Sequence, residues 1–597
     1  MTLTIKTPLA LILTGVLAYQ GCTLKQMIKL SKDQKLVVTP SPIELHGDSV
    51  KFDLAATLPL KMLKKNKIYT ANTSYKYGDQ KLDLGKIEFK ASDYPNAKTQ
   101  EPQTSKKFSF GYTPAITNGD VVVVGTASNL AQTKSKSSPE LPIAKGIITT
   151  SRLVKDVYVV AYAEHGYNNK EELVPNKVEF YFDQGSSKLK VKETGGKKGK
   201  YIDAFVAKKN VTRTVSVVGN HSPEGREIKN AKLSEERASA IEKFYKARLK
   251  KYSKKGEPET ISFVTKGIVQ DWEPLRATLD TTDFLTTEEE ARIIELTNGS
   301  GTFEEKEKSI EQLPSYKKLL TKVYPLLRTA KTEILTIKPK KTDEQILTLA
   351  KGISSGSVSQ DSLKDDELSY AATLTTDLKE KEGIYTAATK KNDSWASHNN
   401  LGAVYLENAA RATDKSEITK FADMAETQFN LSLKAKQNAE AHANLAVVHM
   451  IRGARVLGLD EVNKAVVAEA SDAVKKGAFG TKGILEIKQG SYDDAIQSFS
   501  KADETPGMIY NLALANLLKK NFPAAKSGFE TVQNATPNDA WAFYAGAVTA
   551  ARLKDAASLN TSLKKAVQLD SKLSAKAAGD LEFLDYWNSD DFKNDIK

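Results

Sequence analysis

Residues able to recognise a charged ligand gather just after Gly219. Ser222 lies in the turn-like run Asn220-His221-Ser222-Pro223-Glu224-Gly225, and Asn230 and Arg237 follow in a helical stretch. A guanidinium can pair bidentately with a carboxylate, and a serine hydroxyl can hydrogen-bond an ammonium without neutralising its charge. Arg237 could therefore pair with a carboxylate, and Ser222 could hydrogen-bond an ammonium. The alternative is that Asn230 and Arg237 only hold the loops of their own domain.

The single cysteine, Cys22, directly follows an apolar leader. Residues 1–18 carry Lys6 as their only charge and have an apolar centre, as a secretory signal does. The run Leu17-Ala18-Tyr19-Gln20-Gly21-Cys22, with a small residue before the cysteine, resembles the lipobox of bacterial lipoproteins. The resemblance implies that residues 1–21 are a signal peptide and that Cys22 is lipidated. The alternative is a buried free thiol in an uncleaved helix.

Catalytic chemistry has no recognisable pattern in this sequence. The six histidines are scattered, and none falls in a zinc spacing or a His-Glu-x-x-His motif. There is no P-loop, no Gly-x-Ser-x-Gly elbow and no cysteine besides Cys22 to act as a nucleophile. We therefore expect no enzymatic activity, no metal site and no cofactor. A cryptic hydrolase of wall polymers is the least favoured alternative.

The charge of the chain narrows the choice of partners. The 597 residues carry a formal charge of +13, and lysine supplies far more of the cations than arginine. Arginine is the usual reader of phosphates and base edges, and no arginine-rich or basic-aromatic cluster is present. We therefore expect no nucleic-acid partner. The basic balance fits a solvated surface near something anionic.

The N-terminal part of the sequence is rich in predicted strands. Residues 22–35 are polar and lysine-rich, which predicts a tether. Between residues 36 and 170, alternating runs separated by turn signals predict an antiparallel β-sandwich, with an Ig-like topology as one possibility. Its expected strands are Val50–Leu54, Ile68–Tyr77, Leu84–Phe89, Phe108–Tyr112, Val121–Thr126 and Val157–Ala163. We expect a docking or spacer module.

Residues 171–340 form the predicted domain that carries the candidate ligand residues. Its expected strands are Val178–Phe182, Thr214–Val218, Ile261–Thr265 and Arg328–Ile337. Ser234 is the expected cap of the helix that follows the second strand, because serine favours that position. Residues 272–325 are helical in character, which predicts an insertion between the last two strands.

This domain resembles the OmpA C-terminal-like family, a periplasmic βαβ-type domain that binds peptidoglycan. The residues that match the family signature at its spacing are Gly219, Ser222, Gly225, Asn230, Leu233, Ser234, Arg237 and Ala238. In the family, an acid and the arginine clamp the charged end of the diaminopimelate side chain. Arg237 stands at the arginine position, but Ser222 replaces the acid. The resemblance implies weak peptidoglycan binding through Ser222, Asn230 and Arg237.

Residues 341–597 read as helices with recurring offsets of small and aromatic residues, which predicts an α-helical repeat solenoid. The offsets resemble tetratricopeptide repeats. They occur in Leu401-Gly402-x-x-Tyr405 with Ala425 and Phe429, in Leu445-Ala446, in Gly490-x-Tyr492-x-x-Ala495-x-x-x-Phe499, in Leu512-Ala513, and in Phe522-x-x-Ala525-x-x-x-Phe529 before Pro537. Such arrays form concave surfaces that bind peptides or protein segments, so we expect a protein partner.

The expected fold class is therefore multidomain α+β: a β-sandwich, an OmpA-like βαβ domain with a helical insertion, and a C-terminal repeat solenoid. The expected function is that of a non-catalytic outer-membrane lipoprotein, facing the periplasm, which associates with peptidoglycan and binds a protein of an envelope complex. The alternative is a structural subunit of a secretion, assembly or motility complex whose OmpA-like domain has lost its ligand.

The lipoprotein hypothesis predicts a single point of membrane attachment. Cys22→Ala should abolish acyl labelling and release the protein from membranes, because several acyl chains on one residue supply the apolar burial that holds such a protein. Membrane fractionation and metabolic acyl labelling measure both effects. Unchanged fractionation and labelling of the variant would show that the hypothesis is wrong.

Overall fold

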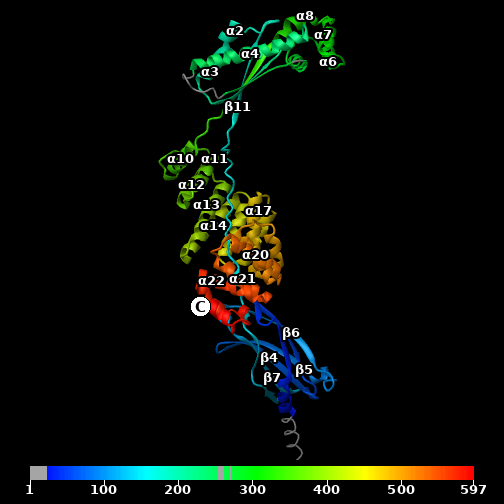
Figure 1. Ribbon diagram of the computed structural model, residues 1–597, viewed down its shortest axis with the longest axis vertical. Helices are drawn as coiled ribbons and strands as arrows, with labels where there is room; N and C mark the ends of the chain where they lie inside the picture. Colours follow the sequence, from blue (N-terminus) through cyan, green and yellow to red (C-terminus); the bar gives the residue numbers. More distant parts are fainter. Residues whose placement is uncertain (1–22, 253–260, 269) are drawn as a thin grey trace, which may run out of the picture. The chain divides into compact units, whose positions relative to one another are not determined.

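The computed structural model describes residues 23–252, 261–268 and 270–597, so the expected signal peptide and Cys22 lie outside the described residues. Contacts divide the chain into two units (Figure 1). One unit joins the residues up to Tyr167 to Asp343–Lys597, and the other is Asn168–Thr342. Within the described ranges, no helix combines the length and apolarity needed to cross a membrane.

Two five-stranded sheets share one core in the N-terminal part. One sheet has the order β1-β3-β2-β10 with β6 beside β3, and the other has the order β5-β4-β7-β8 with β9 beside β7. The strands are β1 (Lys35–Thr39), β2 (Ile43–His46), β3 (Ser49–Thr57), β4 (Lys67–Tyr77), β5 (Gln80–Lys90), β6 (Gln103–Gly111), β7 (Asp120–Asn129), β8 (Ser135–Ser137), β9 (Leu141–Lys145) and β10 (Ile147–Ile148). Tyr75 of one sheet packs against Phe110 of the other, with 5.1 Å between ring centroids.

Two expectations about this N-terminal part are wrong. Residues 23–30 form a helix instead of a free tether, and Leu24 and Met27 are buried in the core of the two sheets. These residues are three apart, so they lie on one face of the helix despite its lysine-rich surroundings. Val157–Ala163 is extended but belongs to no sheet. It packs instead against the core of the helical repeats.

The unit Asn168–Thr342 is a four-stranded sheet, in the order β11-β14-β12-β13, with helices packed on it. Its elements are β11 (Leu173–Tyr181), α2 (Val191–Gly195), α3 (Lys197–Ala207), β12 (Thr212–Gly219), α4 (Glu227–Tyr252), β13 (Ser262–Gly267) and β14 (Thr329–Ile337). β12 and β13 are parallel, whereas β14 runs antiparallel to both β11 and β12. We call this unit the mixed domain.

In the described residues between β13 and β14, five short α-helices and one π-helical turn (Leu319–Val323) share a hydrophobic core of their own. The α-helices are α5 (Glu273–Leu279), α6 (Thr287–Asn298), α7 (Phe303–Glu311), α8 (Tyr316–Lys318) and α9 (Tyr324–Leu327). Thr286 and Thr302 each begin a helix with a capping box, in which a glutamate three residues later returns the hydrogen bond. The acidic residues at these positions therefore fix helix starts.

The predicted helix cap at Ser234 is wrong. α4 begins at Glu227, and the Ser234 hydroxyl lies inside the helix, where it donates to the carbonyl of Asn230 at 3.0 Å. This part of α4 packs closely against Gly219 at the end of β12. A Cβ on Gly219 would collide with the backbone carbonyl of Ser234, so only glycine lets α4 lie this close to the end of β12.

The C-terminal region is a helical repeat array. Three helices, α10 (Asp343–Ser355), α11 (Asp365–Ala371) and α12 (Leu378–Lys391), precede successive helix pairs. The pairs are α13 (Trp395–Arg411) with α14 (Lys415–Ala435), α15 (Ala439–Ile451) with α16 (Arg455–Val467), α17 (Asp472–Gln489) with α18 (Tyr492–Phe499), α19 (Pro506–Leu518) with α20 (Phe522–Ala535), and α21 (Ala540–Leu553) with α22 (Ala556–Leu569). α23 (Lys572–Gly579) and α24 (Asp590–Asp595) follow them.

A small residue on the first helix of a pair receives an aromatic ring from the second helix. A Cβ on Gly402 would stand 2.7 Å from the ring of Phe429, and one on Gly483 would stand 2.8 Å from the ring of Phe499. The ring of Phe529 is fully buried and meets Tyr510 edge-on at 5.3 Å. The recurring small and aromatic offsets in the sequence are therefore the packing contacts of the helix pairs.

These buried rings should dominate the stability of the array. We expect Phe499→Ala and Phe529→Ala each to lower the free energy of unfolding by about 3–5 kcal/mol, because each leaves a cavity between paired helices. Denaturant titration of the full chain measures the loss. Val467→Ala on α16 is the control, since Val467 is 82% exposed. Phenylalanine variants that unfold like this control would contradict the assigned packing.

Candidate functional site

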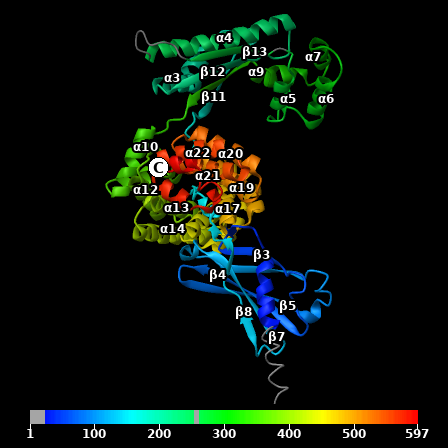
Figure 2. The same cartoon turned by 60° about the horizontal axis from the view of Figure 1, so that its bottom comes forward.

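An extended segment of the chain itself lies along the first helices of the repeat pairs. Residues 154–167 leave the N-terminal sheets and run through the array, whose helices surround them (Figure 2). The segment belongs to no sheet, yet Ala161 and Ala163 are buried. We call residues 154–167 the resident segment and the surface that holds it the groove.

Asparagine side chains bind the backbone of the resident segment. Asn511 accepts the N–H of Lys155 and donates to its carbonyl, both at 2.9 Å. Asn444 makes the same pair of bonds with Ala161 at 2.8 Å, and Asn399 donates to the same carbonyl at 3.0 Å.

The third clamp holds Ala163. Asn400 accepts its N–H at 2.7 Å and donates to its carbonyl at 3.1 Å. A primary amide has both a donor and an acceptor, so one asparagine satisfies the two main-chain groups that a neighbouring strand would otherwise satisfy. The array therefore replaces a sheet partner for this segment.

Between the clamps, two glycines make room for side chains of the segment. A Cβ on Gly507 would lie 2.8 Å from Val157, and a Cβ on Gly477 would lie 2.6 Å from Val159. The alternate residues 155, 157, 159, 161 and 163 thus contact the array through a clamp, two notches and two further clamps. An extended chain has a two-residue period, so the groove fixes the register of the segment.

The intervening side chains add ionic and aromatic contacts. The Tyr162 hydroxyl donates to Glu407 at 2.8 Å, and its ring stacks on Tyr385 at 6.1 Å. Burial and the Glu407 charge raise the pKa of Tyr162 well above its usual value, so its phenol remains a donor. Asp156 pairs with Lys488 at 2.5 Å. These contacts depend on side-chain identity, whereas the asparagine clamps do not.

The N-terminal sheets also meet the array through buried charges. Arg552 of α21 pairs with Glu44 of β2 at 3.0 Å and holds Glu582 through Nε at 2.5 Å and Nη2 at 3.0 Å. Burial alone would raise the pKa of Glu44, but a hydrogen bond from His46 and the Arg552 charge lower it to about 2. Glu44 is therefore ionised at neutral pH, and the sheets and the array form one unit.

The sequence contained a signal for the clamps that the repeat pattern alone did not expose. Each of the three clamp asparagines precedes a leucine and a small residue, in Asn400-Leu401-Gly402, Asn444-Leu445-Ala446 and Asn511-Leu512-Ala513. The leucine and the small residue identify the first helix of a pair. The asparagine before them faces the groove, and its recurrence is the signal for a site that binds backbone.

The candidate residues of the mixed domain do lie together, but their polar groups are already occupied. Arg237 is 1% exposed, and its Nε, Nη1 and Nη2 donate to the carbonyls of Ser186, Asn220 and Asp183 at 3.0, 2.7 and 3.1 Å. Burial and the nearby Arg328 charge lower the pKa of Arg237 to about 10. All three nitrogens therefore hold loops of the domain, as the alternative interpretation of the sequence proposed.

Ser222 hydrogen-bonds to both members of a buried ion pair, Glu224 and Arg328, which the sequence did not reveal. Its hydroxyl donates to Glu224 Oε1 at 2.6 Å and accepts from Arg328 Nε at 3.0 Å. Arg328 Nη2 also pairs with Glu224 at 2.8 Å. Asn230 completes the cluster by donating to the Glu224 carbonyl at 3.1 Å. Arg328 thus supplies from within the chain the cation that faces Ser222 and Glu224.

The helical insertion packs against the same loop. The Phe303 ring of α7 meets His221 edge-on at 6.0 Å, and Glu304 accepts the backbone N–H of Glu227 at 3.0 Å. Glu307 accepts a hydrogen bond from Tyr324 at 2.8 Å, and burial raises the pKa of Glu307 to about 8. The insertion therefore closes the loop that contains Ser222.

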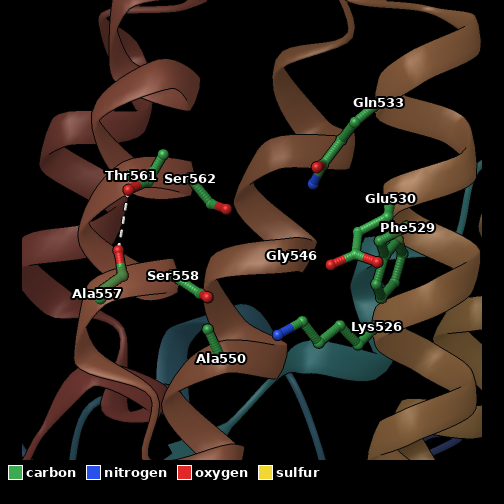
Figure 3. A pocket seen from close by; sticks show the side chains of 10 residues that line it. All are labelled: Lys526, Phe529, Glu530, Gln533, Gly546, Ala550, Ala557, Ser558, Thr561 and Ser562. Atoms are coloured by element: carbon green, nitrogen blue, oxygen red, sulfur yellow. Dashed lines mark hydrogen bonds between the residues drawn. The ribbon is translucent and has the colours of Figure 1, made fainter.

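A hollow of about 270 Å³ lies between α20 and α22, with Gly546 and Ala550 of α21 as its floor (Figure 3). Lys526 on its edge pairs with Asp555 at 3.4 Å, and Thr561 donates to a carbonyl of its own helix. Lys526 and Glu530 are the ionisable groups of its lining.

Comparison with known proteins adds likenesses to the repeat array alone. No family model matches the sequence, and no curated protein matches it. The solved structure of YrrB, described as a tetratricopeptide repeat protein with an unusual peptide-binding site, is 19% identical over 32% of this chain and 97% of its own, with a TM-score of 0.26.

Two further solved structures align with a similar share of the chain. PilF of Pseudomonas aeruginosa is 12% identical over 41% of this chain and 98% of its own, with a TM-score of 0.29. PilW, a type IV pilus biogenesis factor, is 16% identical over 43% of this chain and 100% of its own, with a TM-score of 0.27. At such TM-scores, the assignment of helical repeats rests on the observed helix pairs and their packing.

The clamps predict protection of backbone amides that no sheet protects. In Asn444→Ala, the amide of Ala161 loses its acceptor, and a buried unsatisfied group costs about 1–3 kcal/mol. Hydrogen exchange across residues 154–167 should therefore accelerate roughly 5- to 150-fold by local opening. Asn463→Ala, at an exposed asparagine of the same repeat, is the matched control. Equal exchange in both variants would show that the clamp does not hold the segment.

Proposed function

We propose that the protein is a non-catalytic scaffold of the bacterial cell envelope that is anchored in the outer membrane through lipid on Cys22 and faces the periplasm. The observation that carries the scaffold proposal is the clamping of the resident segment by Asn400, Asn444 and Asn511. The clamps join the N-terminal sheets to the array through the backbone of the resident segment. The anchor and location rest on the lipobox resemblance.

The chain enters and leaves the mixed domain through two segments that are bonded to each other, as expected of a domain inserted in a scaffold. Residues leading into β11 and out of β14 pair with each other: Glu172 binds Lys338 and Lys340, each at 2.8 Å. The backbone N–H of Lys338 also donates to the Glu172 carbonyl at 2.9 Å. Entry and exit are thus fastened together, which lets the domain fold as a unit within the longer chain.

For the mixed domain we propose a structural role in an envelope complex in place of peptidoglycan binding. Arg237 donates hydrogen bonds to three backbone carbonyls of its own domain, and Arg328 already neutralises the charge of Glu224. Peptidoglycan binding, the second candidate function, is favoured by the signature from Gly219 to Ala238. A zwitterionic wall fragment would have to displace Arg328, and this costs buried ionic hydrogen bonds to Ser222 and Glu224.

The protein partner is proposed to bind the repeat array. First helices that carry clamps for an extended backbone make a surface with the chemistry of peptide recognition, since they bind main-chain groups of any sequence. The remaining faces of the array are open to a folded partner. Both modes are those of a scaffold, and neither uses a catalytic group.

Cosedimentation with purified sacculi tests the structural role of the mixed domain. We expect the parent protein to remain in the supernatant, because its ligand loop is filled by Arg328. Arg237→Ala and the matched control Arg213→Ala, at an exposed arginine of the same domain, should not differ. Sedimentation of the parent that Arg237→Ala alone removes would instead establish peptidoglycan binding.

Crosslinking in intact cells tests the scaffold proposal. It should connect the chain to another envelope protein, and the absence of any such crosslink would contradict the proposal.

A further inference from the structure

The groove binds its segment through two kinds of contact that an extended segment of another protein could also make. The clamps at Asn400, Asn444 and Asn511 bind main-chain N–H and C=O groups, which every non-proline residue has. The notches at Gly477 and Gly507 limit only the size of the side chain that faces them. A second extended segment with small or β-branched residues at these alternate positions would meet the same contacts.

Along its middle, the resident segment is held by contacts with the groove. Residues 154–163 have no secondary structure and no sheet neighbour. The contacts that are particular to its sequence include the ion pairs of Lys155 with Asp539 and of Asp156 with Lys488, and the hydrogen bond from Tyr162 to Glu407. Withdrawal of the segment would break these contacts and the hydrogen bonds of the clamps, but it would break no hydrogen bond of a β-sheet.

An emptied groove would be an unfavourable state. The amides of Asn399, Asn400, Asn444 and Asn511 are almost fully buried in the filled groove, and apolar side chains lie beside them. Opening the groove exposes this apolar surface to water, which opposes release unless another segment enters. The groove therefore favours exchange of one strand for another over simple loss.

We propose that the resident segment is an exchangeable ligand held in cis, and that a partner protein's extended segment of the pattern Val-x-Val-x-Ala-x-Ala takes its place. This inference rests on the proposed scaffold function and names the partner's chemistry. The tether sets the threshold for exchange. A segment joined to its own site competes at an effective concentration in the millimolar range, so weakly matching strands are excluded.

The Gly477 notch allows a size-matched test with the full chain. Gly477→Ala adds a methyl group that collides with Val159 of the resident segment, and it should weaken the hold on that segment without loss of the helix. The probe is a fluorescent peptide of residues 152–167, made with Val159 and with Val159→Gly. Gly579→Ala is the control, because a Cβ there meets nothing within 4 Å.

Fluorescence anisotropy should show the Val159→Gly peptide binding Gly477→Ala at least about tenfold more tightly than the Val159 peptide. The parent and Gly579→Ala should bind both peptides only at about millimolar concentration. Equal affinity of Gly477→Ala for the two peptides would overturn the register of the site. Tight binding of the peptide to the parent would overturn the occupation of the groove in cis.

Hydrogen exchange across residues 154–167 reports whether Gly477→Ala loosens the resident segment. If it remains protected, Val159→Asp expels it instead, because a carboxylate cannot enter the apolar notch without a partner. The Val159 peptide must then bind this variant. Failure of peptide binding in both variants would overturn strand exchange, whereas crosslinks of the parent to an envelope protein in cells would still support the scaffold.

Discussion

The interaction on which the first unit depends is the bond between an asparagine amide and the backbone of an extended chain. A strand outside a sheet leaves its N–H and C=O groups unsatisfied, and burying them without partners is costly. Asn511, Asn444 and Asn400 remove that cost at residues 155, 161 and 163. The segment can therefore pass through the array, and the ion pairs of Arg552 then secure the N-terminal sheets beside it.

The same principle operates in the mixed domain, where the chain also fills its own site. Arg237 satisfies three carbonyls of the loops, and Arg328 satisfies Glu224 and Ser222. In both units, groups that could recognise an outside ligand are paired with residues distant in sequence. An outside ligand that binds at either place must therefore compete with an internal occupant, which has the advantage of being tethered.

The sequence predicted elements whose signal is local and missed contacts that are not. Offsets such as Gly483 with Phe499 mark helix pairs, because the two residues meet across one hairpin. The alternation in Val157–Ala163 predicts a sheet strand, but a two-residue period is common to a strand in a sheet and to a strand in a groove. Arg328 stands 106 residues from Ser222, and no periodicity connects them.

The site of domain insertion follows from how the ends of the resident segment are held. Within the first unit, the Tyr167 ring meets Tyr370 at 4.8 Å, and the Tyr370 hydroxyl donates to Asp343 at 3.1 Å. Tyr167 is the last residue before the mixed domain, and Asp343 is the first after it. Both residues that border the mixed domain thus contact the Tyr370 side chain of α11. The contacts that hold the resident segment in the first unit therefore do not depend on the mixed domain. The mixed domain is thus inserted in the sequence between a strand and the array that holds it, at a point where Tyr370 joins the two borders within the first unit.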